Sequence, residues 1–204
     1  MSSPAEASGG QHREPDWVQP AEKVTLGQRA MEGVRYLLAV GVLVGVVGLL
    51  GRLLAWPLIT STIGPTAYVF AAHPKSETAR FRNAVIGHSL AIAVGLLALL
   101  AFGLLRHPSV SALGAPTLPQ VGAAATAGGV TLGLQELFGS HHAPAAATAL
   151  LVATGLAKPG PGLIGLVLGL AIVIAVGPWL GRWPLARRSA AREEPITPQL
   201  GRSG

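Results

Sequence analysis

The sequence predicts an all-α fold, a polytopic bundle of helices in a membrane, and two observations lead to it. Of the 204 residues, 50% are hydrophobic and only 12% are charged, about half the charged share of an ordinary soluble domain. Between Leu53 and Gly181 the charges are limited to Lys75, Glu77, Arg80, Arg82, Arg106, Glu136 and Lys158. A soluble fold could not cover its surface with so few charges, so we expect four to six transmembrane segments.

The charge balance and the absence of cysteine exclude several classes of function. The net charge of +6 does not indicate a nucleic-acid partner, because the basic residues flank apolar spans as they do in membrane proteins. Without cysteine there are no disulfides, no thiol catalysis and no Cys-ligated metal. The first residues lack the apolar core of a secretory signal peptide. The lipid bilayer is therefore the first partner that we expect.

Three regions follow from composition. Residues 1–33 form a polar N-terminal segment that we expect to be mostly disordered, residues 34–182 form the transmembrane domain, and residues 183–204 form a basic, polar tail. The first span is expected from Val34 to Trp56. Its glycines are spaced as in a small-residue face, which favours close helix contact and could join copies of the chain in a homo-oligomer: Gly41, Gly45 and Gly48.

The next part of the domain combines a broken segment with a full span. Pro57 begins an apolar segment that ends near Ala72, and hydroxyls, a glycine and a proline interrupt it around Pro65, where we expect a new helix to start. A charged loop follows. A full span is then expected from Asn83 to Leu105.

The second half repeats this pattern. Gln120 to Phe138 is weakly apolar and rich in Ala and Gly, so we expect it to be packed inside a bundle. A short helix should start near Pro144, because proline suits a first helical turn. It would be roughly 20 Å long, short of a ~30 Å hydrocarbon core, which is typical of a broken or re-entrant helix. The last span is expected from Gly162 to Leu180.

The order long span, short segment, long span thus occurs twice. Such a three-plus-three internal repeat is typical of transporters whose halves have inverted topology. The distribution of Lys and Arg favours six crossings, because the Lys75–Arg82 loop then lies on the same side as both termini. We therefore expect a multi-pass protein of the cell membrane with both termini in the cytoplasm.

The starts of the two short helices are candidates for binding a small anion. A helix N-terminus offers partial positive charge and unpaired N–H donors, and histidine adds a donor that can carry a proton near neutral pH. Candidate substrate-binding residues at these two starts are His141, His142, Pro144 and Thr148, together with Ser61, Thr62, Gly64 and Thr66. The alternative for the histidine pair is a capped helix start in a loop outside the membrane.

Three more polar residues belong to the candidate set. His88 lies about two turns inside its span, so it is either a functional ionisable group or a neutral imidazole bonded to a neighbouring helix. Asn83 stands at the start of the same span. Glu136 either relays a proton or simply ends its helix at the membrane interface. No metal is expected at His141, His142 and Glu136, since adjacent histidines point apart on a helix.

Two stretches resemble the HPP family of small bacterial and plastid membrane proteins, named for a His-Pro-Pro motif. Arg82-Asn83-Ala84-Val85-Ile86-Gly87-His88 is similar to the family's Arg-Asn-x-x-Gly-Gly-His. His142-Ala143-Pro144-Ala145-Ala146-Ala147-Thr148-Ala149 is similar to His-Pro-Pro-Ala-Gly-Ala-Thr-Ala. The first proline of that motif is Ala143 here, its glycine is Ala146, and one glycine of the earlier motif is Ile86, as in a divergent member.

The resemblance implies a bundle of four or more spanning helices without a cofactor. Plant and cyanobacterial relatives are associated with nitrite transport. We therefore expect a transporter-like protein that moves a small inorganic anion such as nitrite. A structural or regulatory membrane subunit without transport activity is the alternative. An enzyme is not expected, because no nucleophile–base set or carboxylate–metal cluster is evident in the sequence.

Overall fold

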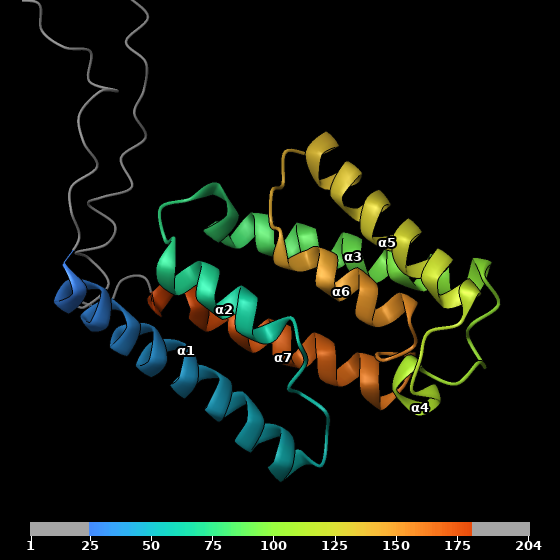
Figure 1. The fold of residues 1–204 in the computed structure, drawn as a ribbon, viewed down its shortest axis with the longest axis horizontal. Coiled ribbons are helices and arrows are strands. Elements are labelled where there is room, and N and C mark those ends of the chain that lie inside the picture. The colour runs from blue at the N-terminus through green and yellow to red at the C-terminus, as the bar shows by residue number, and fades with distance from the viewer. Residues whose placement is uncertain (1–24, 181–204) are drawn as a thin grey trace, which may run out of the picture.

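The computed structural model describes residues 25–180, and these form an all-helical bundle (Figure 1). No strand occurs within this range. Residues 1–24 of the predicted polar N-terminal segment and the basic tail lie outside the described residues, whereas residues 26–33 of that segment belong to a helix. The elements in chain order are α1 (Leu26–Leu54), α2 (Ile63–Ala72), η2 (Glu77–Ala79), α3 (Phe81–Ala101), α4 (Val110–Leu113), α5 (Leu118–Leu137), α6 (Pro144–Ala153) and α7 (Pro161–Leu180).

Helix starts follow local signals in the sequence. α1 begins at Leu26, ahead of the predicted start at Val34, because Thr25 and Gln28 form a reciprocal capping box just before it. Pro144 occupies the first turn of α6, as the sequence predicts. α2 begins at Ile63, slightly before the expected start near Pro65. The two short helices are therefore present where the sequence places them.

Helix length and hydropathy identify the chain as a helical membrane protein. Three helices, α1, α3 and α7, are long and apolar enough to cross a bilayer. α5 has 20 residues but is not one of the three. α2 and α6 have 10 residues each, which is roughly 15 Å of helix and half of a ~30 Å hydrocarbon core. The number of crossings stays a prediction.

The six main helices alternate in direction along the chain. In the view of Figure 1, α1 and α3 run from left to right with α2 running back between them, whereas α5 and α7 run from right to left with α6 running back. The described chain begins and ends at the same end of the bundle. This arrangement is the one that an inverted three-plus-three repeat predicts.

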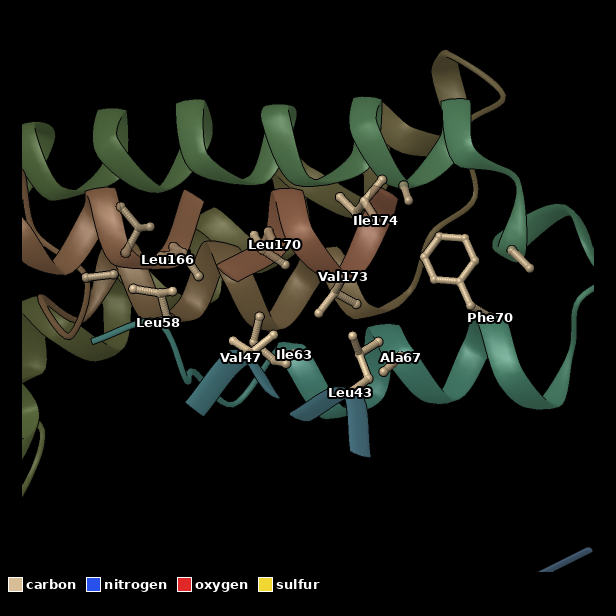
Figure 2. Packing of buried hydrophobic residues seen from close by; sticks show 14 residues of the cluster. Leu43, Val47, Leu58, Ile63, Ala67, Phe70, Leu166, Leu170, Val173 and Ile174 are labelled. Atoms are coloured by element: carbon tan, nitrogen blue, oxygen red, sulfur yellow. The ribbon is translucent and has the colours of Figure 1, made fainter. Parts of the chain in front are cut away.

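The third helix of each repeat packs against the first two helices of the other repeat. α1 and α2 pack against α7, α5 and α6 pack against α3, and α3 contacts α7 between the two groups. The α1–α2–α7 group encloses an apolar core that includes Val47, Ile63 and Leu170 (Figure 2). The core of the α3–α5–α6 group is built mainly from alanines, among them Ala91 and Ala127. Small side chains allow these three helices to approach closely.

Two expectations about small residues need correction. α5 is not packed inside the bundle, because only one stripe of its surface is buried. In α1, a Cβ added at Gly41 or Gly45 would meet no other helix within 4 Å, and Leu43 and Val47 form the buried face instead. A role for these glycines in a homo-oligomer stays a prediction. In α7, by contrast, a Cβ on Gly169 would collide with the backbone carbonyl of Leu58.

Candidate functional site

His88 joins the two short helices. It is buried in the second turn of α3, with Nε2 3.2 Å from Thr66 Oγ1 of α2 and Nδ1 2.9 Å from Thr148 Oγ1 of α6. The Thr66 hydroxyl donates to the Thr62 carbonyl at 2.7 Å, so it accepts a hydrogen from His88 Nε2. Nδ1 is then the acceptor for the Thr148 hydroxyl. Both ring nitrogens are paired, which is typical of a neutral imidazole that ties helices together.

His142 is fully buried in the connection between α5 and α6. Its backbone N–H donates to Gln135 Oε1 at 2.8 Å, and its Nδ1 lies 2.7 Å from the carbonyl oxygen of Thr78. Because a carbonyl oxygen only accepts, Nδ1 carries the hydrogen of this bond. The remaining ring nitrogen, Nε2, has no hydrogen-bond partner among the described residues. His142 therefore differs from His88 in keeping one polar atom open.

Three other buried polar atoms near His142 lack partners within the described range, namely Thr131 Oγ1, Gln135 Nε2 and Ser140 Oγ. Gln135 contacts His142, its backbone carbonyl accepts from Ser140, and Thr131 stands one turn earlier on α5. We call these four residues the α5–α6 polar cluster. An unpaired buried polar group costs about 1–3 kcal/mol. Buried polar groups without a protein partner are candidates for binding water or a polar ligand.

Gly87 brings α3 close to the α5–α6 polar cluster. A Cβ at this position would lie 3.1 Å from the Cβ of His142, 3.3 Å from that of Ala145 and 3.6 Å from Cδ of Gln135. The ring of His142 packs edge to face on His88, with 4.9 Å between the ring centroids. His142 and Ser140 have no exposed surface. The cluster is thus closed in this conformation, and a ligand reaches it only when the surrounding segments move.

The short helix of the first repeat packs in the same way, but an apolar residue takes the place of His142. Ile63 stands two residues before the proline of α2, as His142 does before the proline of α6. Its Cδ1 would lie 3.1 Å from a Cβ on Gly169 of α7, a contact equivalent to that of His142 with Gly87 of α3. Ile63 is part of the apolar core (Figure 2). The two short helices meet at His88, but the open polar groups come from the second repeat alone.

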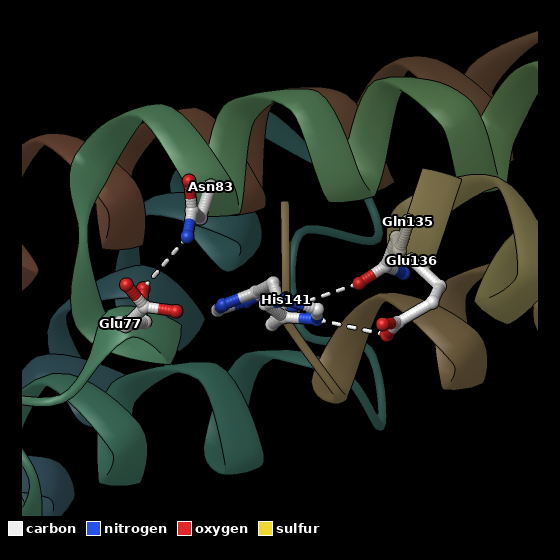
Figure 3. A network of polar contacts seen from close by, with 6 residues as sticks. Glu77, Asn83, Gln135, Glu136 and His141 are labelled. Carbon is white, nitrogen blue, oxygen red and sulfur yellow. Dashed lines mark hydrogen bonds and ion pairs between the residues drawn. The ribbon is translucent and has the colours of Figure 1, made fainter. Parts of the chain in front are cut away.

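His141 and Glu136 lie outside the cluster. His141 Nδ1 lies 3.3 Å from Glu136 Oε2 (Figure 3). The side chain of Glu136 is 79% exposed and that of His141 is 41% exposed. The pair therefore sits at the surface, at the end of α5, while the neighbouring His142 points into the protein.

The other candidate residues have mainly local contacts. Asn83 is buried and donates from Nδ2 to the Glu77 carbonyl at 2.9 Å, which fixes the start of α3 (Figure 3). Thr62 is buried and its Oγ1 lies 3.2 Å from Thr60 Oγ1. Ser61 is exposed. Two further candidates complete the set: Pro144 is buried in the first turn of α6, and a Cβ added at Gly64 would meet no atom within 4 Å.

Sequence reasoning did not select Thr131, Gln135 or Ser140 as site residues. A signal for two of them is present, because Ala123, Ala127, Thr131 and Gln135 follow one another at intervals of four and form one buried stripe of α5. Polar residues that replace alanine at the end of such a stripe point toward the same neighbour as the alanines. Ser140 has no comparable signal, since it lies beyond the helix.

Electrostatics favour an uncharged His142 in the closed state. Burial lowers the pKa of His142 below its ordinary value of 6.5, and the hydrogen bond to the Thr78 carbonyl opposes this shift. Burial has the larger effect. The ring is therefore neutral near pH 7 and holds a lone pair on Nε2.

An open depression runs between α3 and α7 beside His88. Its lining is mostly apolar, and His88 and Ser89 are the polar side chains in it. Such a surface does not suit an inorganic anion, which needs several donors. The α5–α6 polar cluster is the better candidate.

Comparison with known families agrees with this architecture. The family model described as the HPP transmembrane region matches residues 25–188. The chain belongs to the HPP transmembrane-region family. The resemblance in the Arg82–His88 and His142–Ala149 stretches is thereby confirmed, and both stretches meet where His88 packs on His142. No curated protein and no solved structure matches this HPP protein.

Proposed function

We propose that this HPP protein is a membrane transporter for a small inorganic anion, which passes through the α5–α6 polar cluster. The observation that carries the proposal is His142, a fully buried histidine at the start of a short helix with Nε2 unpaired. Gln135 Nε2 and Ser140 Oγ supply donors, and His142 Nε2 becomes a donor when the ring binds a proton. Amide, hydroxyl and imidazole groups bind an anion without changing it, so we propose transport rather than enzyme chemistry.

Physical chemistry supports an anion as the cargo. A bare charge is costly in a low-dielectric interior, and hydrogen-bond donors at a helix start offset that cost. An inverted repeat with short helices at its centre suits a site that opens to each side in turn. Nitrite is the cargo that the resemblance within the family implies, and its oxygens would accept from the donors of Gln135 and Ser140.

We also propose the cell membrane as the location and a cytoplasmic position for both termini. In Figure 1 the start of α1, the α2–α3 connection and the end of α7 lie at one end of the bundle. That end holds most of the described basic residues, among them Lys75, Arg80 and Arg82, while Arg106 and Lys158 lie in connections at the other end. The positive-inside rule assigns the basic end to the cytoplasm.

Nitrite uptake into liposomes tests the proposal. The purified full-length protein would be reconstituted, and uptake followed with and without a pH gradient beside protein-free liposomes. Uptake above the protein-free rate supports transport. Uptake no faster than the protein-free rate would remove nitrite as the cargo and favour a structural or regulatory membrane subunit.

A further inference from the structure

We propose that His142 binds a proton together with the anion, so that the site takes up one proton for each anion it holds. The inference rests on the proposed function and adds the coupling ion to it. It follows from the hydrogen bonds that fix the ring, from the absence of a fixed cation facing it, and from burial.

The Thr78 carbonyl determines which nitrogen of His142 faces the cluster as an acceptor. Nδ1 must donate to this carbonyl at 2.7 Å. In the neutral ring, Nε2 then has only a lone pair, and a lone pair repels an anion. Protonation at Nε2 converts this atom into a charged donor, which forms the stronger, charge-assisted type of hydrogen bond. An anion therefore binds to the protonated ring in preference to the neutral one.

No fixed positive charge faces His142 from the described elements around it. On α3, His88 has both ring nitrogens bonded to threonine hydroxyls. α2 presents the apolar ring of Phe70, 6.4 Å from His142 between centroids, and α6 contains no titratable residue. The titratable groups in the neighbouring connections are exposed or paired at the surface: Glu136 lies beside His141, Glu77 pairs with Arg80, and Lys75 and Arg82 are exposed. Charge neutrality in the buried site therefore has to come from a proton on His142.

The affinity of the site for the anion should therefore depend on pH. Since burial lowers the pKa of the empty ring below 6.5, the ring is neutral between about pH 6.5 and 8, and each bound anion brings one additional proton with it. The apparent Kd for the anion then rises about tenfold for each unit of pH in this range. Affinity should thus be highest on the acidic side of a membrane, and an inward proton gradient should drive uptake.

Calorimetric titration of the full-length protein in detergent with sodium nitrite tests the inference. Titrations at one pH in phosphate and in Tris, whose ionisation heats differ, give the number of protons bound per nitrite. We expect about one proton for the wild type, because one histidine changes state. His142→Gln keeps a donor but cannot titrate, so its count should be near zero. His141→Gln, which replaces the neighbouring surface histidine, should keep a count of about one.

The outcomes separate this inference from the proposed function. Nitrite binding by the wild type without proton uptake would overturn the inference and leave the anion site intact. Proton uptake that persists in His142→Gln, or that is lost in His141→Gln, would also overturn it, since another group would then hold the proton. A wild type that binds no nitrite at either end of the pH range would refute nitrite as the cargo and the inference with it.

Discussion

The imidazole rings of His88 and His142 pack edge to face, with 4.9 Å between their centroids and 66° between their planes, yet only the ring of His88 has all its hydrogen bonds. The two histidines therefore have different roles. His88 links α2, α3 and α6 through two threonines. His142 rests on this link and keeps Nε2 free for a ligand or a proton.

Loss of the Thr148 hydroxyl should destabilise the protein. Thr148→Val keeps the shape of the side chain but leaves Nδ1 of His88 buried without a partner, which costs about 1–3 kcal/mol. We expect a lower midpoint of thermal unfolding, followed by helical circular dichroism in detergent. Thr126→Val is the matched control, because Thr126 is exposed. Equal midpoints for the two variants would contradict the bridging role of His88.

A methyl group at Gly87 should separate α3 from the start of α6. Its Cβ would press on the Cβ atoms of His142 and Ala145 at 3.1 and 3.3 Å, and neither atom can turn away. Gly87→Ala should therefore cost about 1–3 kcal/mol of unfolding free energy. Gly128→Ala is the control, since its nearest neighbour is the flexible Leu150 at 3.7 Å. If both variants unfold alike, the close contact at Gly87 is not present.

Helix α7, which packs against α1 and α2, should be as sensitive to an added methyl group as α3 is. A Cβ on Gly169 would collide with the backbone carbonyl of Leu58, so Gly169→Ala should cost at least as much as Gly87→Ala, about 3 kcal/mol. Gly41→Ala in α1 meets no neighbour within 4 Å and should leave monomer stability unchanged or slightly higher. The thermal midpoints of the two variants would show this difference, and a reversed order would contradict the packing of α7 on the α1–α2 connection.

Stability of the empty protein should fall on acidification. The folded-state pKa of His142 is lowered relative to its ordinary value of 6.5, so the unfolded chain binds the proton more readily. The contribution of this residue is complete above about pH 6.5 and is lost as the pH falls below that value. Thermal midpoints measured from about pH 8 to 5 should therefore fall less steeply in His142→Gln than in the wild type.

His141, the exposed neighbour of His142, supplies the control for this pH series. His141→Gln removes an imidazole from the same connection and leaves the buried ring in place, so it is the control for the substitution itself. Parallel curves for the wild type and His142→Gln would show that the buried ring does not titrate on unfolding.

Much of the fold could be predicted from sequence. Apolar runs, prolines and charged loops located α3, α6 and α7 and the order of the two repeats, because these signals act locally. α1 began earlier than its hydropathy suggested, since the Thr25–Gln28 capping box extends it into a polar stretch. The outward position of Gly41 and Gly45 could not be predicted, because a small-residue spacing does not say which helix, if any, lies opposite.

The site was predicted in part for a similar reason. His88, His142, Thr66 and Thr148 were selected by residue type and position, and the structure brings all four together. Nothing in the sequence distinguishes His141 from His142, whose opposite burial depends on how α6 packs against Gly87. The contribution of Gln135 likewise depends on the turn between α5 and α6, which sets its contact with the His142 backbone.

The adjacent histidines offer the most direct test of the central claim. Nitrite uptake would be measured in liposomes that contain equal amounts of the wild type, His142→Gln or His141→Gln, with helical content checked for each. We predict that His142→Gln loses most of the proton-driven uptake, while His141→Gln transports at nearly the wild-type rate. Undiminished uptake by a folded His142→Gln variant, or an equal loss in both variants, would contradict an anion site at His142.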